Sequence, residues 1–423
     1  MFIARSEARV RAARLAFVLL AALPAAGLVS WAAYLRSDAH RAAVEREWQT
    51  ATGLPLAIGR VEHPRPGVIR AVDCLLPAGS DRPAFAVPLI ELESSADEDR
   101  LRIDRLACDP AAASLFAAAA RAWLMESLRF RRTCIVEVAD FHWAGEPLPE
   151  SPVDRPVAVP LRIECVVRDD SRAVRAVRRG TGGDEVRIVR HLRQGPADAL
   201  DRFEIDAVCS EPVPLAVLAT AGGISPDVAT VAAAAARVAG ELHAVREGGR
   251  WRGTAHGRVT GLDLAPLAAL VGSRAAGTAA LEVARLEWDH SRLQHGLIEA
   301  FTGPGWIDGR LFDRLVLATG ARPGAASENT TEAGRSFDAA ACLATVGEHG
   351  VQFLPTPRLP AALAVRASGI VLAPPTAPVP GDRIAWMLTA PGTAFGPSAG
   401  PGAWLMSVLP PPAPLKTGSE RHF

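Results

Sequence analysis

The sequence predicts a mainly β protein with a few helices (α+β), in which an N-terminal transmembrane helix precedes an elongated antiparallel β-sheet. Three observations predict this class. A single uncharged apolar run lies near the N-terminus, short segments of alternating apolar and polar residues recur through the body, and Pro, Gly and Asp clusters separate those segments. A parallel sheet covered by helices would instead give continuously apolar strands.

The apolar run extends from Leu15 to Leu35 and carries no charge, whereas four arginines precede it within the first 14 residues. Its 21 residues suffice to cross a hydrocarbon core of about 30 Å at about 1.5 Å per residue. The charge asymmetry favours a cytoplasmic N-terminus and a body, from Arg36 onward, on the far side of the membrane.

A cleaved signal peptide is the main alternative for this segment. The small residues between Ala22 and Gly27 would suit a signal peptidase. The apolar run continues well past that point, however, and Trp31 and Tyr34 lie where an aromatic belt would meet the far headgroups. We therefore expect an uncleaved anchor.

A short helix and a run of strands follow the apolar run. Ser37 or Asp38 is a typical N-cap for a helix that continues to Thr50, and Gly53 is a typical stop. The next segments are short, apolar or β-branched, and bounded by turn residues. The expected strands are 56–62, 67–75, 85–93 and 101–108, with another at 133–143.

A second helix is predicted from Asp109, because an Asp cap followed by Pro at the first helical position is a strong start signal. It is expected to continue to about Arg129. Phe116, Trp123 and Leu128 share one apolar stripe, so this helix should pack on the sheet.

The alternation is clearest in two later strands, 161–168 and 202–209. Ile163 and Cys165 lie on the apolar face of the first, and Phe203 and Ile205 lie on that of the second. A period of two gives each strand one apolar and one wet face. Short helices are expected at 211–218, 263–270 and 306–316, a polar loop at 321–335, and a Pro/Gly-rich segment from Pro374 onward.

Composition excludes several classes of function. The formal net charge is zero, whereas a nucleic-acid partner would call for a basic surplus. No zinc-protease helix motif or phosphate-binding loop motif is present, and His290 and His295 are interpreted as turn residues rather than metal ligands. We therefore expect no enzyme activity, no catalytic residues, no cofactor and no metal site.

Six cysteines are present, and none has the spacing of a metal or redox motif. Most fall in predicted strands, where a free thiol behaves as a small buried hydrophobe. Disulfides remain the alternative outside the cytoplasm, with no connectivity that the sequence can choose.

Two regions carry a family resemblance. The segment Thr52 to Glu62 (TGLPLAIGRVE), directly after the predicted anchor, resembles the start of AsmA-like proteins of the bacterial envelope, as do 67–73, 85–92 and 101–109. A second region, from Gly277 through the hairpin to the segment 306–316, resembles the C-terminal end of that family. The motifs are patterns of strand and turn, cover about 150 residues by our count, and lack a clear repeat between them.

The resemblance implies a single-pass protein of the bacterial inner membrane, with a groove-shaped β-structure in the periplasm, linked to phospholipid movement or envelope maintenance. It supplies no catalytic residues. The resulting division of the chain is a cytoplasmic stub (1–14), a transmembrane helix (15–35), an N-terminal AsmA-like module (36–145), a β-rich repeat-like module (157–320), terminal strands (336–373) and a Pro/Gly-rich tail (374–423).

The apolar strand faces allow two functions. In an open groove, Ile163, Cys165, Phe203 and Ile205 would contact lipid, and the expected partners are membrane lipids, with an envelope protein or a second copy extending the groove. In a closed sandwich the same residues would fill a core, and the chain would be a membrane-tethered scaffold. The resemblance favours the groove.

Overall fold

The computed structural model describes residues 7–52, 54, 56–76, 85–108, 110–126, 132–143, 159–179, 183–192, 202–215, 235–327, 334–347, 349–367, 369–387 and 407–409. The chain divides into two compact units, the first comprising Met1–Leu106 and Ala119–Asp140, the second Ala107–Ala118 and Phe141–Phe423. Eighteen strands of the described residues belong to antiparallel ladders, and a further three form a small sheet. The predicted mainly β class with a few helices is confirmed.

The first unit begins with a helix in three parts, α1 (Glu7–Phe17), a π-helical turn η1 (Val18–Ala22) and α2 (Leu23–Leu35). Within the described part of the chain, one helix is long and apolar enough to cross a membrane, and it spans Arg9–Leu35. The predicted apolar helix is therefore confirmed. A membrane anchor and a signal sequence share these properties.

Helix α3 (Asp38–Thr52) follows, and the Ser37 hydroxyl caps it by accepting a hydrogen bond from the His40 backbone N–H at 3.3 Å. Trp48 of this helix is buried, and the Glu45 carboxylate accepts a hydrogen bond of 2.8 Å from the backbone N–H of Ile58 in strand β1. The strands of this unit are β1 (Ala57–Arg65), β2 (Val68–Leu76), β3 (Phe85–Ser94), β4 (Glu98–Cys108) and β5 (Thr133–Trp143). They match the predicted strands closely.

Strands β1 to β4 pair in sequence order as an antiparallel meander. Ala71, Ile90 and Ile103 lie opposite one another across β2, β3 and β4, and all three are buried. Their side chains form a core on one face of this unit.

Helix α4 (Pro110–Met125) lies where the sequence predicts it, although it ends earlier than expected. Ala113, Trp123 and Leu124 are its buried residues among those whose side chains are described. Asp109, the expected cap, and Leu128, of the expected stripe, lie outside the described residues.

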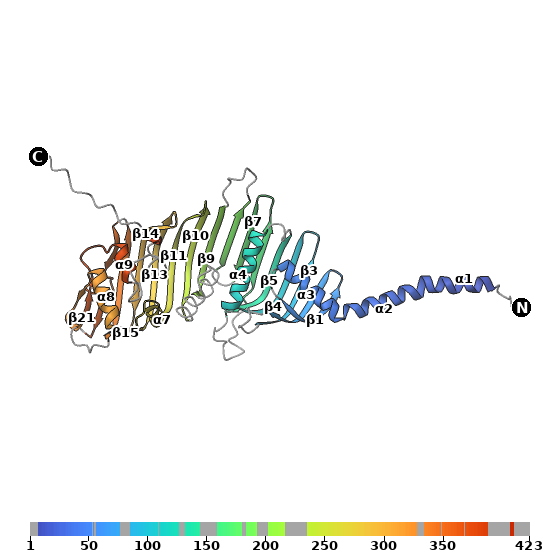
Figure 1. Ribbon diagram of the computed structural model, residues 1–423, viewed down its shortest axis with the longest axis horizontal. Helices are drawn as coiled ribbons and strands as arrows, with labels where there is room; N and C mark the ends of the chain where they lie inside the picture. The colour runs from blue at the N-terminus through green and yellow to red at the C-terminus, as the bar shows by residue number, and fades with distance from the viewer. Residues whose placement is uncertain are drawn as a thin grey trace. The chain divides into compact units, whose positions relative to one another are not determined.

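In the second unit, eight long strands follow one another in sequence order, each paired antiparallel with the next (Figure 1). They are β6 (Leu161–Val167), β7 (Ser171–Arg178), β8 (Asp184–His191), β9 (Arg202–Pro214), β10 (Arg237–Glu247), β11 (Arg250–Asp263), β13 (Thr278–Asp289) and β14 (Arg292–Thr302). Helix α7 (Leu264–Leu270) separates β11 from β13, capped by the Asp263 side chain as the sequence predicts.

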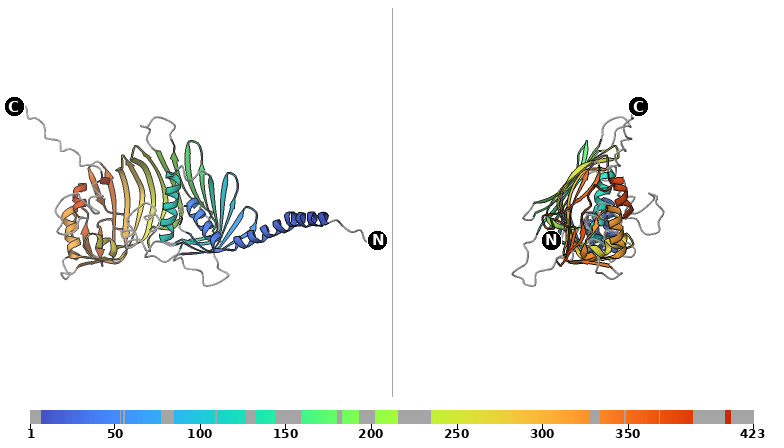
Figure 2. Two further views of the ribbon diagram at one scale, coloured as in Figure 1. Left: turned by 45° about the vertical axis from the view of Figure 1, so that its right-hand side comes forward. Right: turned by 90° about the vertical axis from the view of Figure 1, so that its left-hand side faces the viewer.

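The same sheet continues from β14 into the shorter strands β16 (Arg322–Pro323), β18 (Ala339–Gly347), β19 (Gly350–Leu354), β20 (Ala364–Arg366) and β21 (Gly369–Ala373). The small separate sheet comprises β12 (Ala275–Ala276), β15 (Gly305–Asp308) and β17 (Gly334–Phe337). The helical segments of this region are α8 (Gly309–Thr319), the 3₁₀ turn η3 (Ala325–Ser327) and α9 (Gly381–Met387). Figure 2 shows helices α8 and α9, in orange and red, beside these last strands. Phe312 of α8 packs in one buried cluster with Phe337 and Val371, and Ile384 of α9 packs in another with Val346 and Val351.

Three local predictions need correction. The expected helix at 211–218 is strand β9 as far as Pro214, because the Asp184 carboxylate accepts hydrogen bonds from the backbone N–H groups of Ser210 and Glu211 and holds them extended. The helix expected from Trp306 begins at Gly309, where the Asp308 side chain caps it. The loop expected at 321–335 contains β16, η3 and the start of β17.

Candidate functional site

The four residues singled out in the sequence lie on one face of the second unit's sheet. Cys165 of β6 and Ile205 of β9 belong to a single cross-strand row, connected through Val174 of β7 and Ile188 of β8. Directly opposed residues in antiparallel strands point to the same face of the sheet. Because side chains two apart share a face, Ile163 and Phe203 lie on this face as well.

Two apolar rows cross the sheet on this face, which we call the apolar face. The first comprises Ile163, Ala176, Val186, Ala207, Leu242, Ala255, Leu286, Gly296, Val346 and Val351, one from each of ten successive strands from β6 to β19. The second comprises Cys165, Val174, Ile188, Ile205, Ala244, Gly253, Trp288 and Leu293, from β6 to β14. No polar side chain interrupts either row.

Burial along β11 separates the two faces of this sheet. From Trp251 to Val259 the odd-numbered residues are half-buried, whereas the even-numbered residues from Arg252 to Thr260 are exposed. The four predicted residues are likewise half-buried. Val174 and Ala244 of the second row are buried, whereas Cys165, Ile188 and Ile205 of that row are half-buried. The apolar face in this region is therefore partly buried and partly accessible to water.

The same face becomes a closed core toward the C-terminal strands. Val346 and Val351, the last members of the longer row, belong to the buried cluster that includes Ile384 of α9. The sheet itself is open among the described residues, because β6 and β19 do not pair with each other. A covered end and a half-buried middle thus occur on one continuous surface.

The opposite face carries ion pairs between neighbouring strands, together with a few buried apolar residues such as Val189 and Val245. The Arg175 guanidinium donates hydrogen bonds of 2.8 and 2.9 Å to the Glu185 carboxylate, and this contact lowers the pKa of Glu185 below its usual value. His243 and Asp206 are 2.6 Å apart across β10 and β9. These pairs are solvated, so each stabilises the sheet by less than about 1 kcal/mol.

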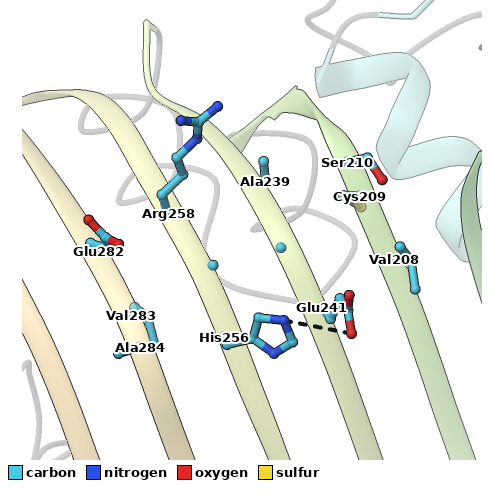
Figure 3. A pocket seen from close by; sticks show the side chains of 12 residues that line it. Val208, Cys209, Ser210, Ala239, Glu241, His256, Arg258, Glu282, Val283 and Ala284 are labelled. Carbon is cyan, nitrogen blue, oxygen red and sulfur yellow. Dashed lines mark ion pairs between the residues drawn. The ribbon is translucent and has the colours of Figure 1, made fainter. Parts of the chain in front are cut away.

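A shallow hollow of about 440 Å³ lies on this polar face, over β9, β10, β11 and β13 (Figure 3). Glu241 and His256 form an ion pair across it at 3.6 Å, and Arg258 and Glu282 come from directly opposed positions of β11 and β13. Both members of the ion pair are more than half exposed, so the hollow has the character of a hydrated surface.

Two paired glycines form the floor of this hollow. Gly240 and Gly257 face each other with φ of +150° and +151°. A Cβ added to Gly240 would lie 2.2 Å from the carbonyl oxygen of His256, and one added to Gly257 would lie 2.3 Å from that of Ala239. The backbones of β10 and β11 therefore approach too closely here for any side chain.

All six cysteines are free thiols. Burial raises the pKa of Cys74 and of Cys134 to about 12 and that of Cys342 to about 11. Burial also raises the pKa of Cys209, beside the hollow. Such thiols are protonated at neutral pH and serve as small apolar side chains.

Among the described residues no three His, Cys, Asp or Glu side chains lie close enough together to hold a metal ion. His290 and His295 are placed apart: His290 lies in the β13–β14 turn, hydrogen-bonded to Asp289, and His295 lies in β14 opposite Glu287.

Sequence reasoning found strands β6 and β9 but missed that β10 and β11 continue their apolar face. The strand signal there is weakened by three glycines, Gly240, Gly253 and Gly257. The polar residues at even-numbered positions between Trp251 and Thr260 could nevertheless have indicated a strand. Sequence reasoning also missed that Arg172, Arg190 and Arg246 lie in one cross-strand row with Phe203 at a border of the face.

Comparison with known proteins finds no family model that matches the chain, and no similar curated protein or solved structure. The candidate site is therefore defined by its own geometry: an open antiparallel sheet with one apolar and one ion-paired face, in a chain that begins with an apolar helix.

Proposed function

We propose that this chain is a membrane-anchored, AsmA-like protein of the bacterial envelope that holds or moves lipid on the apolar face of its second unit. The single observation that carries the proposal is the uninterrupted apolar row across ten strands, half-buried in its middle. A soluble protein seldom leaves so large an apolar surface without an occupant. The resemblance of residues 52–109 to AsmA-like proteins supports the same conclusion.

Acyl chains suit this surface energetically. Each methylene group removed from water contributes about 0.8 kcal/mol, so ten methylenes laid along the face would contribute about 8 kcal/mol before ordering costs. The function needs no bond to be broken, and we propose that the protein is not an enzyme and uses no cofactor.

The proposed location is the bacterial inner membrane, with residues 1–14 in the cytoplasm, the helix at 15–35 retained as an anchor, and the body in the periplasm. The arginines before the helix support this orientation. Mass spectrometry of the mature chain from membranes tests it, because a retained anchor leaves residues 1–35 in place. Cleavage after Gly27 would replace the anchor by a signal peptide.

A photo-crosslinking side chain at position 205, compared with one at position 206, tests lipid contact. These neighbours belong to the same strand but point to opposite faces of the sheet. Crosslinking in cells should give a lipid adduct from position 205 and none from position 206. Equal labelling at the two positions, or none at position 205, would contradict the proposal.

The second candidate function is a membrane-tethered scaffold, and the covered C-terminal end favours it. There α8 and α9 already close the same sheet into buried clusters. If a partner protein or a second copy covers the middle in the same way, position 205 will crosslink to a polypeptide instead of a lipid.

A further inference from the structure

The apolar helix meets the body of the first unit at a single turn residue. Arg36 lies between α2 and α3 and departs from helical geometry, with φ of −98° and ψ of 1°. The backbone N–H and the hydroxyl of Ser37 both donate hydrogen bonds to the Tyr34 carbonyl oxygen, at 2.9 and 2.7 Å. A residue at the end of an element can absorb a change of φ and ψ and so act as a pivot. The direction of α2 relative to the sheet therefore depends on the side-chain contacts that cross this turn.

A chain of four rings makes these contacts. The ring centroids of Trp31 and Tyr34 lie 6.0 Å apart, those of Tyr34 and His40 5.2 Å, and those of His40 and His63 5.0 Å. Trp31 and Tyr34 belong to α2, His40 belongs to α3, and His63 belongs to β1. Rings at such separations pack against one another. The chain thus connects the end of the apolar helix to the first strand of the sheet.

The two histidines of this chain are hydrogen-bonded to each other, with their Nε2 atoms 2.8 Å apart. One ring donates and the other accepts, so one Nε2 carries no proton. A first added proton preserves the bond, because an imidazolium can donate to a neutral ring. A second proton leaves two cationic rings, each with a donor at Nε2 and neither with an acceptor, and the contact becomes repulsive.

The carboxylates around the pair are already engaged. The partners are Asp38 with Arg41, Glu62 with Arg60, Glu91 with Arg70 and Glu93 with Arg65, on α3 and on strands β1 to β3. Glu45 of α3 is bonded to the backbone of β1, and Arg36 adds a further positive charge at the turn. Consistent with this setting, burial and the charge of His40 lower the pKa of His63. The surroundings therefore disfavour the second proton, and the pair stays joined until the medium is acidic.

Two other contacts hold α3 against β1 without histidine. The Glu45 carboxylate accepts the hydrogen bond from Ile58, and the Arg41 guanidinium donates one of 3.4 Å to the Gly59 carbonyl oxygen. Carboxylates and guanidinium groups ordinarily keep their charge between about pH 5 and 8, where histidine titrates. Trp48 of α3 is also buried. Mild acid therefore leaves α3 on the sheet and acts on the ring contacts.

We propose that the His40–His63 pair is a pH-operated latch, which holds the first sheet in one direction relative to the apolar helix and releases it when both rings are protonated. Repulsion between the two rings moves His40 away from β1, and the Tyr34 ring then loses the partner that connects α2 to the sheet. The inference rests on the part of the proposed function that retains residues 15–35 as an anchor, and it is independent of lipid binding.

The test measures the distance between the apolar helix and the sheet in the full-length chain, reconstituted in nanodiscs. Spin labels on genetically encoded ketone side chains replace Leu28 of α2 and Leu75 of β2, two exposed residues of the same unit, so that the native cysteines remain unlabelled. Double electron–electron resonance gives the distance distribution at about pH 7.5 and about pH 5, on the two sides of the ordinary histidine pKa of about 6.5.

Three variants accompany the unaltered chain. H40Q/H63Q keeps two side chains that can donate and accept a hydrogen bond but do not titrate. H63A removes the bond at either pH, and because His63 is exposed, its truncation opens no cavity. The matched control is H256Q, which removes an exposed, ion-paired histidine of the second unit. Thermal unfolding of each variant confirms that it is folded at both pH values.

We expect the distance distributions of the unaltered chain and of H256Q to be narrow at the higher pH and about twofold broader at the lower pH, since release populates further orientations. H40Q/H63Q should give a narrow distribution at both pH values, and H63A a broad one at both.

The inference is overturned if the unaltered chain gives the same width at both pH values, or if H40Q/H63Q broadens on acidification as the unaltered chain does. A narrow distribution for H63A at the higher pH would overturn it as well, because other contacts would then set the direction of the helix. A mature chain that lacks the apolar helix would contradict the retained anchor instead, and mass spectrometry of the mature chain detects that failure separately.

Discussion

A charge placed at position 205 distinguishes an open apolar face from a closed core. Ile205 is half-buried between Ile188 and Ala244 on neighbouring strands. Complete burial of an isoleucine contributes about 1.5–3 kcal/mol, so a half-buried one loses about 1–1.5 kcal/mol on replacement by glutamate. A glutamate there reaches water and lies about 7 Å along the strand from Phe203 and its arginines, so its charge adds little further cost.

We therefore expect Ile205→Glu to destabilise the second unit by about 1–2 kcal/mol, which lowers its Tm by about 3–6 °C for a unit of this size. The comparison variant is Val371→Glu, because Val371 is 2% exposed within the closed cluster around Phe312. A carboxylate buried there should cost above about 4 kcal/mol and lower the Tm by at least about 10 °C, or prevent folding.

The assay is thermal unfolding of the full-length chain in detergent, followed by circular dichroism, together with the lipid content of each purified variant. Ile205→Glu should stay folded and lose bound lipid. If Ile205→Glu lowers the Tm as much as Val371→Glu does, the middle of the face is a sealed core, and the reasoning from half-burial is wrong.

Three further predictions follow from individual residues. Gly240→Ala should destabilise the second unit by about 3 kcal/mol or more, because the new Cβ meets a carbonyl oxygen at a strained φ, whereas Gly303→Ala, with open space around it, should change the denaturant midpoint little. The His40 and His63 rings are hydrogen-bonded at 2.8 Å, and burial and the charge of His40 lower the pKa of His63. A lowered pKa means that the unfolded chain binds the proton more readily than the folded chain does. The stability from this pair is therefore present above about pH 6.5 and lost as the pH falls below it. His63→Gln should flatten the dependence of Tm on pH between about 5 and 7. Cys74, fully buried with its pKa raised to about 12, should resist iodoacetamide in the folded chain at pH 8 and react after unfolding, as peptide mass spectrometry would show.

The strands could be predicted wherever alternation was strong and the turns contained typical residues. Strands β1 to β5 follow from short apolar or β-branched segments between turn residues, β6 and β9 follow from apolar residues at every second position, and α4 and α7 follow from their capping signals. Local pattern suffices in these segments because each strand carries its own two-faced character.

The remaining elements depend on contacts that no local pattern contains. Glu211 and Pro212 resemble a helix start, but the Asp184 carboxylate, from another strand, binds the backbone there and keeps β9 extended. Strand β11 contains glycines that lower its propensity, and its pairing on both sides with β10 and β13 overrides that preference.

The apolar face of each strand could be predicted from the sequence, but the residues that lie at the borders of the combined face could not. Period two places Ile163 and Ile205 on apolar faces, and register alone shows that these faces are one. The cross-strand row that contains Arg172, Arg190 and Arg246 could not be predicted for the same reason, since these residues are distant in sequence and meet only through the pairing of four strands.

The cross-strand rows also determine how such a protein can change over evolutionary time. Any apolar side chain can occupy a row position, so identity at each position is weakly constrained. Insertion of a single residue within a strand, however, would turn all later side chains of that strand to the opposite face, whereas hairpin loops can change length freely. Selection on this surface thus acts on the alternation of apolar and polar positions along each strand. Two chains of this architecture can diverge in nearly every residue while keeping the same apolar face.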